Sequence, residues 1–472
     1  MPALSNLALA LFALLAALII YGLAWRATVA STRGVRLAVR GGLLLFIALP
    51  TAVMLLLAPA MQQSAMGPRP QVSSPFEDQY GRAYDGADRS LAQEQLDGFG
   101  NYAPPETVAP PSNDPAGGAG PPLALEDKAE ELWEVVPVFF GTDREERPDP
   151  IRLMFNSERG RRLELGQAIV TVPKSHLVPN IERPWVLKVP YFDVTIYEED
   201  EDPAKHFTMQ EIKKLTQDEF IALARERIAK SSSYREHALV FVHGYNTSFD
   251  HAVYRTAQIA YDLKFDGAAF LYSWPSGGAV ASYTYDRESA QASAPYMRRF
   301  LELVIQQTGA KSVSIIAHSM GNQPLLEVLR DMRYSAPQAV AISEVILAAP
   351  DVDADNFANL TDSIEQVAKG VTLYAAANDR ALMISRNFWR KPRAGDVTAA
   401  GPLILPGIQT IDVTAASTDT LALNHSGYAE NNDLLQDIGK LILEGLRPPE
   451  QRLPVLKRVG TPRGEYWRYT AP

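Results

Sequence analysis

Hydrophobic and polar positions divide the chain into an apolar start, a polar middle and a long patterned remainder. Two apolar runs without any charged residue, residues 4–25 and 41–60, open the chain. Each is close to the roughly 20 residues that a helix needs to cross the hydrocarbon core of a membrane. We therefore expect a two-span transmembrane anchor over residues 1–60, with membrane contact through residues 4–60.

The loop between the two runs indicates the orientation of this anchor. It carries no acidic residue and four basic ones, Arg26, Arg33, Arg36 and Arg40. Positively charged loops stay in the cytoplasm, so the rest of the chain should lie on the other side, the periplasmic side of the inner membrane in a bacterium. A cleaved secretory signal is the alternative, since Arg40, the second run and residues 58–60 would form one if translation began late.

The polar middle, residues 61–122, is rich in Pro, Gly, Ala, Ser and Gln. Such a composition buries too little apolar surface to offset the entropy of an ordered chain, so we expect a flexible linker. A folded domain should then occupy residues 123–472.

Within that domain, short apolar runs alternate with helical patterns. Strands are predicted over residues 135–142, 168–172, 185–197, 238–242, 268–272, 312–317, 341–348, 371–376 and 408–413. Helices are predicted over residues 216–230, 250–263, 286–307, 320–332 and 432–446. Apolar strands separated by helices are typical of a mostly parallel sheet covered on both faces, so the fold class is α/β. Ligand sites in such sheets form at the carboxyl ends of the strands.

Charge and composition exclude several function classes. A net charge of −10 argues against nucleic acid as a partner, because phosphate binding needs a basic face. The absence of cysteine excludes disulfides, thiolate zinc sites and cysteine nucleophiles.

One serine follows a predicted strand and opens a predicted helix. It is Ser319, in the sequence Ala-His-Ser-Met-Gly of residues 317–321. This strand–turn–helix context is the one that the nucleophile elbow of α/β hydrolases requires, and Gly321 and Ala317 supply the small neighbours of that sharp turn. A serine that merely caps the helix is the alternative.

A second motif, His-Gly-Tyr-Asn at residues 243–246, ends a strand two strands before the serine. In α/β hydrolases, the oxyanion hole takes one amide from the residue after the nucleophile, here Met320. The other comes from a loop after an earlier strand, for which Tyr245 is the first candidate and Asn246 the second. His243 is interpreted as a structural histidine.

The base and the acid should follow the serine in the chain. His425 is the only histidine beyond Ser319, and it lies after the last predicted parallel strand, so we assign it as the base. Asp379, after the strand over residues 371–376, is favoured as the acid. Asp351 and Asp353, which follow the preceding strand, remain alternatives.

Three segments carry a resemblance to a known family. Residues 241–246, residues 272–276 and residues 317–322, together with residues 138–144, resemble a bacterial family of α/β hydrolases of unknown function, often labelled esterase- or lipase-like. The resemblance covers roughly residues 130–445 and implies the α/β-hydrolase fold, a serine–histidine–acid triad and acyl hydrolysis.

These observations together predict a membrane-anchored serine hydrolase that acts on a carboxylic ester or a related small or lipid-like acyl compound. Such a triad needs no cofactor or metal. Two alternatives remain: acyl transfer to an alcohol or amine of a membrane substrate by the same residues, and a non-catalytic hydrolase-like binding or assembly factor.

Overall fold

A computed structural model describes residues 132–189, 194–277, 282–335, 342–416 and 428–470, all within the compact unit Gly120–Pro472. The expected anchor at residues 1–60 and linker at residues 61–122 lie outside the described residues. Among the residues that are described, no helix has both the length and the hydropathy of a membrane span.

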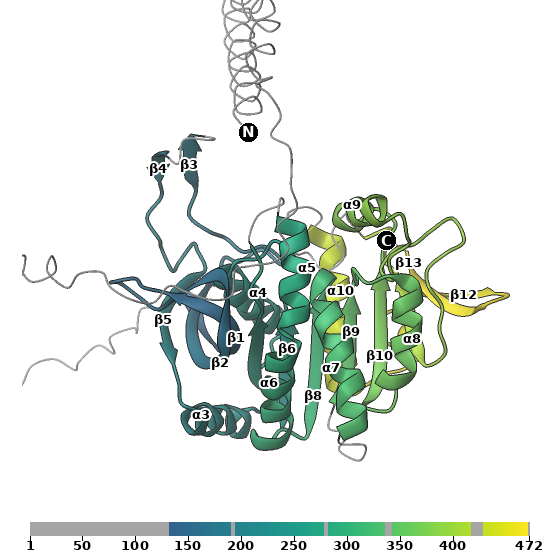
Figure 1. Cartoon of the computed structure of the whole chain (residues 1–472), viewed down its shortest axis with the longest axis horizontal. Coiled ribbons are helices and arrows are strands. Elements are labelled where there is room, and N and C mark those ends of the chain that lie inside the picture. The colour runs from purple at the N-terminus through teal and green to yellow at the C-terminus, as the bar shows by residue number, and fades with distance from the viewer. Residues whose placement is uncertain (1–131, 190–193, 278–281, 336–341, 417–427, 471–472) are drawn as a thin grey trace, which may run out of the picture. The chain divides into compact units, whose positions relative to one another are not determined.

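An 11-stranded sheet forms the centre of the described domain (Figure 1). Its order is β12-β13-β11-β10-β9-β8-β6-β7-β1-β2-β5. The strands are β1 (Trp133–Arg147), β2 (Met154–Pro173), β5 (Thr208–Lys214), β6 (His237–Val242), β7 (Ala268–Ser273), β8 (Ser312–His318), β9 (Ile342–Ala348), β10 (Ala368–Ala375), β11 (Ile408–Asp412), β12 (Leu456–Thr461) and β13 (Gly464–Tyr469). In this order, the strands from β13 to β1 pair in parallel with their neighbours. Antiparallel pairing adds β12 at one edge of the sheet and β2 and β5 at the other.

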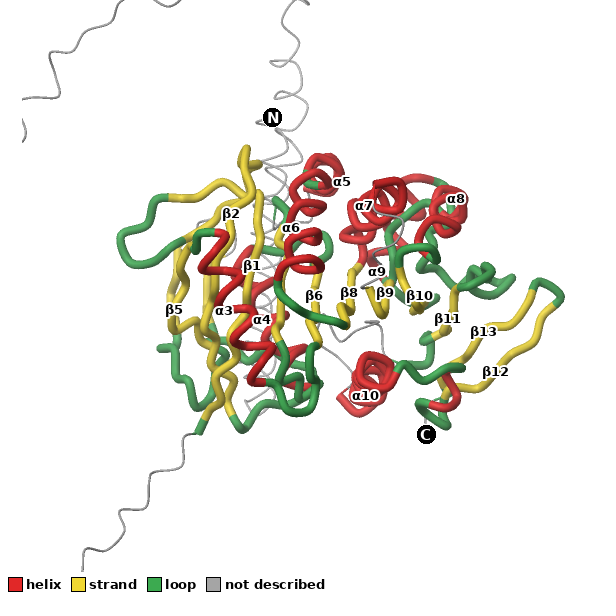
Figure 2. Tube along the Cα trace, turned by 90° about the horizontal axis from the view of Figure 1, so that it is seen from below, coloured by secondary structure: helices red, strands yellow, loops and turns green. Residues whose placement is uncertain are grey.

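Helices cover both faces of the sheet (Figure 2). The helices are α3 (Gln217–Lys230), α4 (Phe249–Asp262), α5 (Tyr283–Ala292), α6 (Ala294–Gln307), α7 (Asn322–Ser335), α8 (Ala354–Ile364), α9 (Arg380–Trp389) and α10 (Tyr428–Glu444). Side chains of α3, α6, α7 and α8 pack into one core, and those of α4 and α10 pack into the other. The two cores lie on opposite faces because successive strand residues alternate: Val240 and Val242 join the first, and Leu239 and Phe241 the second.

The mostly parallel sheet with helices on both faces confirms the predicted fold class. The strand expected over residues 168–172 is the much longer β2, which begins at Met154, and two other predicted elements are each divided in two. The single helix expected over residues 286–307 is two helices, α5 and α6, separated at Ser293. Pro295 stands in the first turn of α6, where its missing amide hydrogen is tolerated, whereas it would break a continuous helix.

The single strand expected over residues 185–197 is instead an antiparallel pair, β3 (Val186–Val189) and β4 (Val194–Glu198), that forms its own two-stranded sheet. Four regular segments were not predicted at all: β5, α8, α9 and the β12–β13 hairpin. Of these, β5 and the hairpin form the outer edges of the large sheet, where exposed charged residues interrupt the apolar pattern.

Candidate active site

Ser319 lies in a sharp turn at the carboxyl edge of the sheet. Strand β8 ends at His318, a short 3₁₀ turn spans Ser319–Gly321, and α7 begins at Asn322. The backbone of Ser319 has a φ of 51°, in the left-handed region that side chains with a Cβ rarely adopt. Such a strained serine between strand and helix has the backbone geometry of a nucleophile elbow.

Two glycines make this turn possible. A Cβ on Gly321 would lie 2.3 Å from the carbonyl oxygen of His243, so only glycine fits between the turn and the end of β6. A Cβ on Gly244 would lie 2.6 Å from Nδ1 of His318 and 2.9 Å from Cβ of Ser319. The loop after β6 is therefore packed directly against the serine, as the predicted oxyanion loop must be.

The carbonyl oxygen of Ser319 is held from two directions. The side-chain amide of Asn322 donates a hydrogen bond of 2.9 Å to it, and the backbone amide of Asp351 donates one of 3.1 Å. The first bond lies within the elbow and the second reaches across from the loop after β9. These contacts fix the orientation of the strained peptide.

The carboxylate of Asp351, one of the three candidate acids, forms a buried ion pair with Arg393. One oxygen of its carboxylate accepts hydrogen bonds from Nε of Arg393 at 2.7 Å and from the hydroxyl of Ser385 at 2.6 Å. The other oxygen accepts from the hydroxyl of Tyr283 at 2.7 Å. Burial and the charge of Asp351 raise the pKa of Tyr283 to about 12, so Tyr283 is a donor at neutral pH.

The other two candidate acids cap helices. Asp353 accepts from the amides of Asp355 and Asn356 at the start of α8. Asp379, which is buried, accepts from the amide of Leu382 at 2.9 Å at the start of α9.

The loop that contains Asp379 is tied to the loop after β11. Thr414 accepts from the amide of Ala377 at 3.0 Å through its hydroxyl and from the side chain of Asn378 at 3.2 Å through its carbonyl. The segment with the predicted base His425 continues from this second loop. His425 itself lies outside the described residues, so its position stays a prediction.

Two other histidines lie next to Ser319. His243 is buried and stacks on Trp274 with ring centroids 4.9 Å apart. Its Nδ1 lies 2.8 Å from the carbonyl oxygen of Gly244, which agrees with the structural role interpreted from the sequence. Burial holds the pKa of His243 well below its ordinary value, and the charge of Arg144 acts in the same direction. Burial also lowers the pKa of His318, to about 3.

The two candidate oxyanion amides differ in their surroundings. The amide of Asn246 donates to the carboxylate of Asp286 at 3.2 Å and is thereby turned toward that side chain. Tyr245 follows Gly244, the residue that packs against Ser319, and its ring packs on Tyr283 with centroids 5.4 Å apart. Met320, the other predicted donor, is buried in the turn directly after the serine.

Sequence reasoning missed two residues that support this loop. Arg144 and Asp286 are both buried and both bind the residues around the His-Gly-Tyr-Asn motif. Arg144 stands in one of the segments that carry the family resemblance. Nothing in the sequence relates it to its partners His243 and Ser276, which follow it by 99 and 132 positions.

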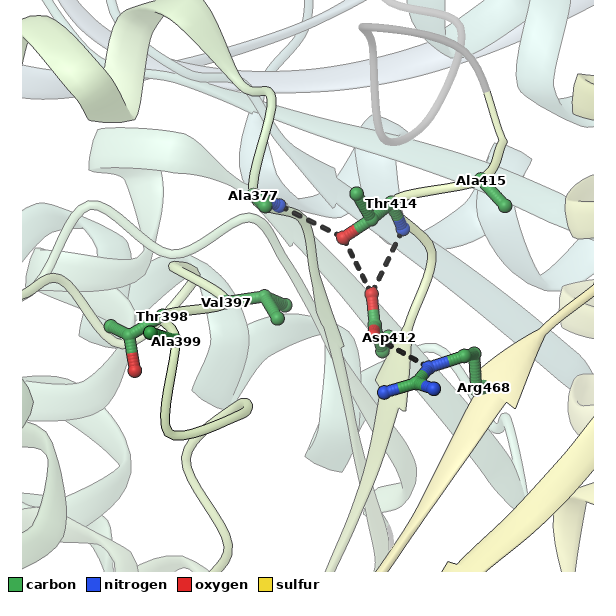
Figure 3. Close-up of a pocket in the computed structure, with 8 residues that line it drawn as sticks. All are labelled: Ala377, Val397, Thr398, Ala399, Asp412, Thr414, Ala415 and Arg468. Atoms are coloured by element: carbon green, nitrogen blue, oxygen red, sulfur yellow. Dashed lines mark hydrogen bonds and ion pairs between the residues drawn. The ribbon is translucent and has the colours of Figure 1, made fainter.

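An open pocket of about 560 Å³ lies at the carboxyl ends of β10 and β11 (Figure 3). Its lining is mostly apolar and includes Ala377, Val397, Ala399 and Ala415. At its polar side, Asp412 binds Thr414 and accepts from Nε of Arg468 at 3.2 Å (Figure 3). One of the residues that line this pocket, Ala377, stands two positions before Asp379 in the chain.

The comparison with known protein families agrees with the fold. Residues 220–444, from α3 to the end of α10, match a family described as alpha/beta hydrolase of unknown function (DUF900), which confirms the resemblance seen in the motifs. The chain is 26% identical over 136 residues to the uncharacterized protein alr1448 of Nostoc sp. strain PCC 7120, covering 24% of this chain and 35% of that protein. It also aligns with an extracellular alpha/beta-hydrolase from a Paenibacillus species, described as sharing structural and functional homology with tobacco salicylic acid binding protein 2. That alignment has 15% identity, covers 42% of this chain and 85% of the other, and has a TM-score of 0.19.

Proposed function

We propose that this chain, whose residues 220–444 match an α/β-hydrolase family, is a serine hydrolase of carboxylic esters or related acyl compounds. The observation that carries the proposal is Ser319, held in a left-handed conformation between β8 and α7. A backbone strain of this kind costs of order 1–3 kcal/mol and is retained mainly where a site uses it. The two glycines that permit the turn add weight, because they leave room for nothing larger beside the serine.

The reaction proceeds in two acyl-transfer steps. The hydroxyl oxygen of Ser319 attacks the carbonyl carbon of the ester while His425 accepts the hydroxyl proton. The amides of Met320 and Tyr245 donate to the oxyanion of the tetrahedral intermediate. Its collapse releases the alcohol, which takes the proton from His425. Water, deprotonated by the same imidazole, then attacks the acyl carbon of the acyl-enzyme. The bond to the hydroxyl oxygen of Ser319 breaks, this oxygen takes the proton back from His425, and the acid is released.

The assignment of the base rests on exclusion as well as on chain order. An efficient general base has a pKa near the pH at which the enzyme works. His318, with a pKa of about 3, and His243, whose pKa is also strongly lowered, do not meet this condition. His425 remains the histidine that the fold order requires.

Asp379 is the acid in this proposal. Asp351 already binds Arg393, Ser385 and Tyr283 through its carboxylate, which leaves little capacity to orient an imidazole. Asp379 lies in a loop that is bonded to Thr414, on the segment that leads toward His425. The pocket beside this loop would accept part of the substrate, because its apolar lining suits an alkyl group.

Turnover of a graded ester series tests the proposal. The full-length chain, purified in mild detergent, should hydrolyse 4-nitrophenyl esters of increasing acyl length, and Ser319→Ala should abolish hydrolysis at every length. The matched control is Ser312→Ala, at the amino end of the same strand, which should retain full turnover. Hydrolysis that persists in Ser319→Ala, or a folded wild-type protein that turns over no ester, would contradict the proposal.

We also propose that the two apolar runs anchor the chain in the inner membrane with the hydrolase domain on the periplasmic side. The support is the loop between them, whose basic residues favour the cytoplasm. Because the chain has no cysteine, single thiols report the topology directly. In bacterial spheroplasts, a membrane-impermeant maleimide should label Ser64→Cys and leave Ser31→Cys unlabelled until lysis. Labelling of both positions, or loss of the first 60 residues from the mature protein, would contradict the anchor.

A further inference from the structure

Asp286 connects two loops at the carboxyl edge of the sheet. Its buried carboxylate, in the first turn of α5, accepts hydrogen bonds from the amide of Asn246 at 3.2 Å and from the amide of Gly277 at 2.6 Å. It also accepts from the hydroxyl of Ser276 at 2.6 Å. That hydroxyl in turn accepts from the amide of Thr247 at 3.0 Å. Two consecutive amides of the loop after β6 are thus held by Asp286 directly and through Ser276.

Arg144 binds the same two loops from the other side. Arg144 as a whole is 2% exposed, and its guanidinium donates to the carbonyl oxygen of Thr247 at 2.8 Å and to that of Ser276 at 3.1 Å. It also lies 3.4 Å from Nε2 of His243. An anion therefore holds the amides of the loop and a cation holds its carbonyl oxygen. Hydrogen bonds to charged groups are shorter and roughly twice as strong as neutral ones.

These hydrogen bonds also constrain the peptide that comes before them in the chain, which carries the amide of Tyr245. Asn246 has a φ of 56°, in the left-handed region that asparagine tolerates better than most residues, and its amide is directed at Asp286. This fixes the turn one residue after Tyr245 and two residues after Gly244, which packs against Ser319. The Tyr245 amide belongs to the peptide between Gly244 and Tyr245, which is thus restricted on one side by the contact of Gly244 with Ser319 and on the other by the turn at Asn246.

We infer that Asp286, acting with Arg144, is a positioning residue for the oxyanion loop, residues 243–247. It keeps the amide of Asn246 turned away from the reaction centre and thereby leaves that of Tyr245 to face the substrate oxyanion. The inference rests on the proposed function and deepens it, since it assigns the residues that pre-organise the site. Pre-organised donors at an oxyanion are commonly the largest single contribution to catalysis of acyl transfer.

Asp286→Asn tests this inference with little change of shape. The new amide group presents N–H donors to at least one of the groups that donate to Asp286 now, so the loop loses part of its anchor. We expect kcat for 4-nitrophenyl butyrate to fall about 100-fold with KM nearly unchanged, as when one oxyanion donor is lost. Affinity for an alkylboronic acid, whose tetrahedral serine adduct mimics the oxyanion, should fall by a similar factor.

The matched control is Asp437→Asn. Asp437 is also buried and paired with an arginine, Arg452, at 2.7 Å, but it lies on α10 in contact with Tyr374. Its substitution should lower stability at least as much as Asp286→Asn does and leave kcat per titrated site unchanged. Equal losses of kcat in both variants, or unchanged boronate affinity in Asp286→Asn, would overturn the inference.

Hydrogen exchange provides a readout that does not depend on turnover. In Asp286→Asn, the amides of Asn246 and Thr247 should exchange at least about ten-fold faster than in the wild type, because Asp286 holds them directly and through Ser276. Asp437→Asn should leave them unchanged. If the wild type hydrolyses no ester, the proposed function fails while the exchange experiment still tests the loop. Unchanged exchange in Asp286→Asn would overturn the positioning role by itself.

Discussion

The carbonyl oxygen of Ser319 accepts a hydrogen bond of 3.1 Å from the backbone amide of Asp351. This bond links the nucleophile turn after β8 to the loop after β9, and the side chain of Asp351 links that loop further to Arg393. Asp351 thus supports the nucleophile turn through its backbone amide, whereas Asp379 is the acid that we propose. The two aspartates should respond differently to the same substitution.

Asp379→Asn should abolish most of the activity and leave the fold intact. Asparagine caps helices as well as aspartate does, so the cap on Leu382 is retained and stability should change by less than about 1 kcal/mol. Loss of the charge that orients the base should lower kcat by about 10³- to 10⁴-fold. Steady-state ester kinetics and urea unfolding measure both quantities.

Asp351→Asn should show the reverse. It leaves the buried guanidinium of Arg393 without its counter-charge, which costs about 3–5 kcal/mol. The folded fraction should retain a kcat within about ten-fold of the wild type, a factor that corresponds to about 1.4 kcal/mol. A stable Asp351→Asn protein without activity, together with an active Asp379→Asn, would reverse the two assignments.

Gly321→Ala should damage both the fold and the site. Its Cβ would lie 2.3 Å from the carbonyl oxygen of His243, and backbone must move to make room. Overpacking of this kind costs about 1–3 kcal/mol. Gly439→Ala on α10 is the control, since its Cβ would lie 3.5 Å from Leu263 in ordinary contact. Urea unfolding of Gly321→Ala that matches the wild type would show that the turn is less constrained than its geometry indicates.

The pH dependence of stability should report the buried side chain of His176. Burial lowers the pKa of His176, but hydrogen bonds and charges from Asp262 and Glu182 raise it to about 9. The folded state therefore holds the proton more tightly than the unfolded state, whose pKa is near 6.5. The resulting stability, about 3 kcal/mol, is fully present below pH ~6.5 and is lost as the pH rises through about 9.

Urea unfolding between pH 6 and pH 10 measures this loss, with His176→Gln as the reference. The wild type should lose about 3 kcal/mol more than the variant over that range. Parallel profiles for the two proteins would mean that His176 is not charged in the folded state at neutral pH.

The sequence predicted those parts of the fold that depend on local pattern. Strand β8, the turn at Ser319 and helix α7 follow from an apolar run, small residues and helical spacing within about twenty neighbouring positions. The parallel direction of the central strands follows from their alternation with helices. The break between α5 and α6 had a local signal in Pro295, which the prediction of one continuous helix did not take into account.

Contacts between residues that are far apart in the sequence could not be predicted from such patterns. Asp351 and Asp379 both follow a strand. They are distinguished by the contact of Asp351 with Arg393, which lies 42 positions further along the chain. Similarly, the hydrogen bond that directs the amide of Asn246 at Asp286 joins residues that are 40 positions apart in the chain. Such pairings depend on tertiary structure, which brings charged groups together without leaving a spacing in the sequence.

The most direct test of the central claim is the covalent trapping of Ser319. The full-length protein should react with a fluorophosphonate, and peptide mass spectrometry should locate the adduct on Ser319 alone. Ser319→Ala and His425→Ala should both fail to react, while His237→Ala, at the amino end of β6, should react as the wild type does. An adduct on another residue, or full reaction of His425→Ala, would contradict a serine nucleophile activated by that histidine.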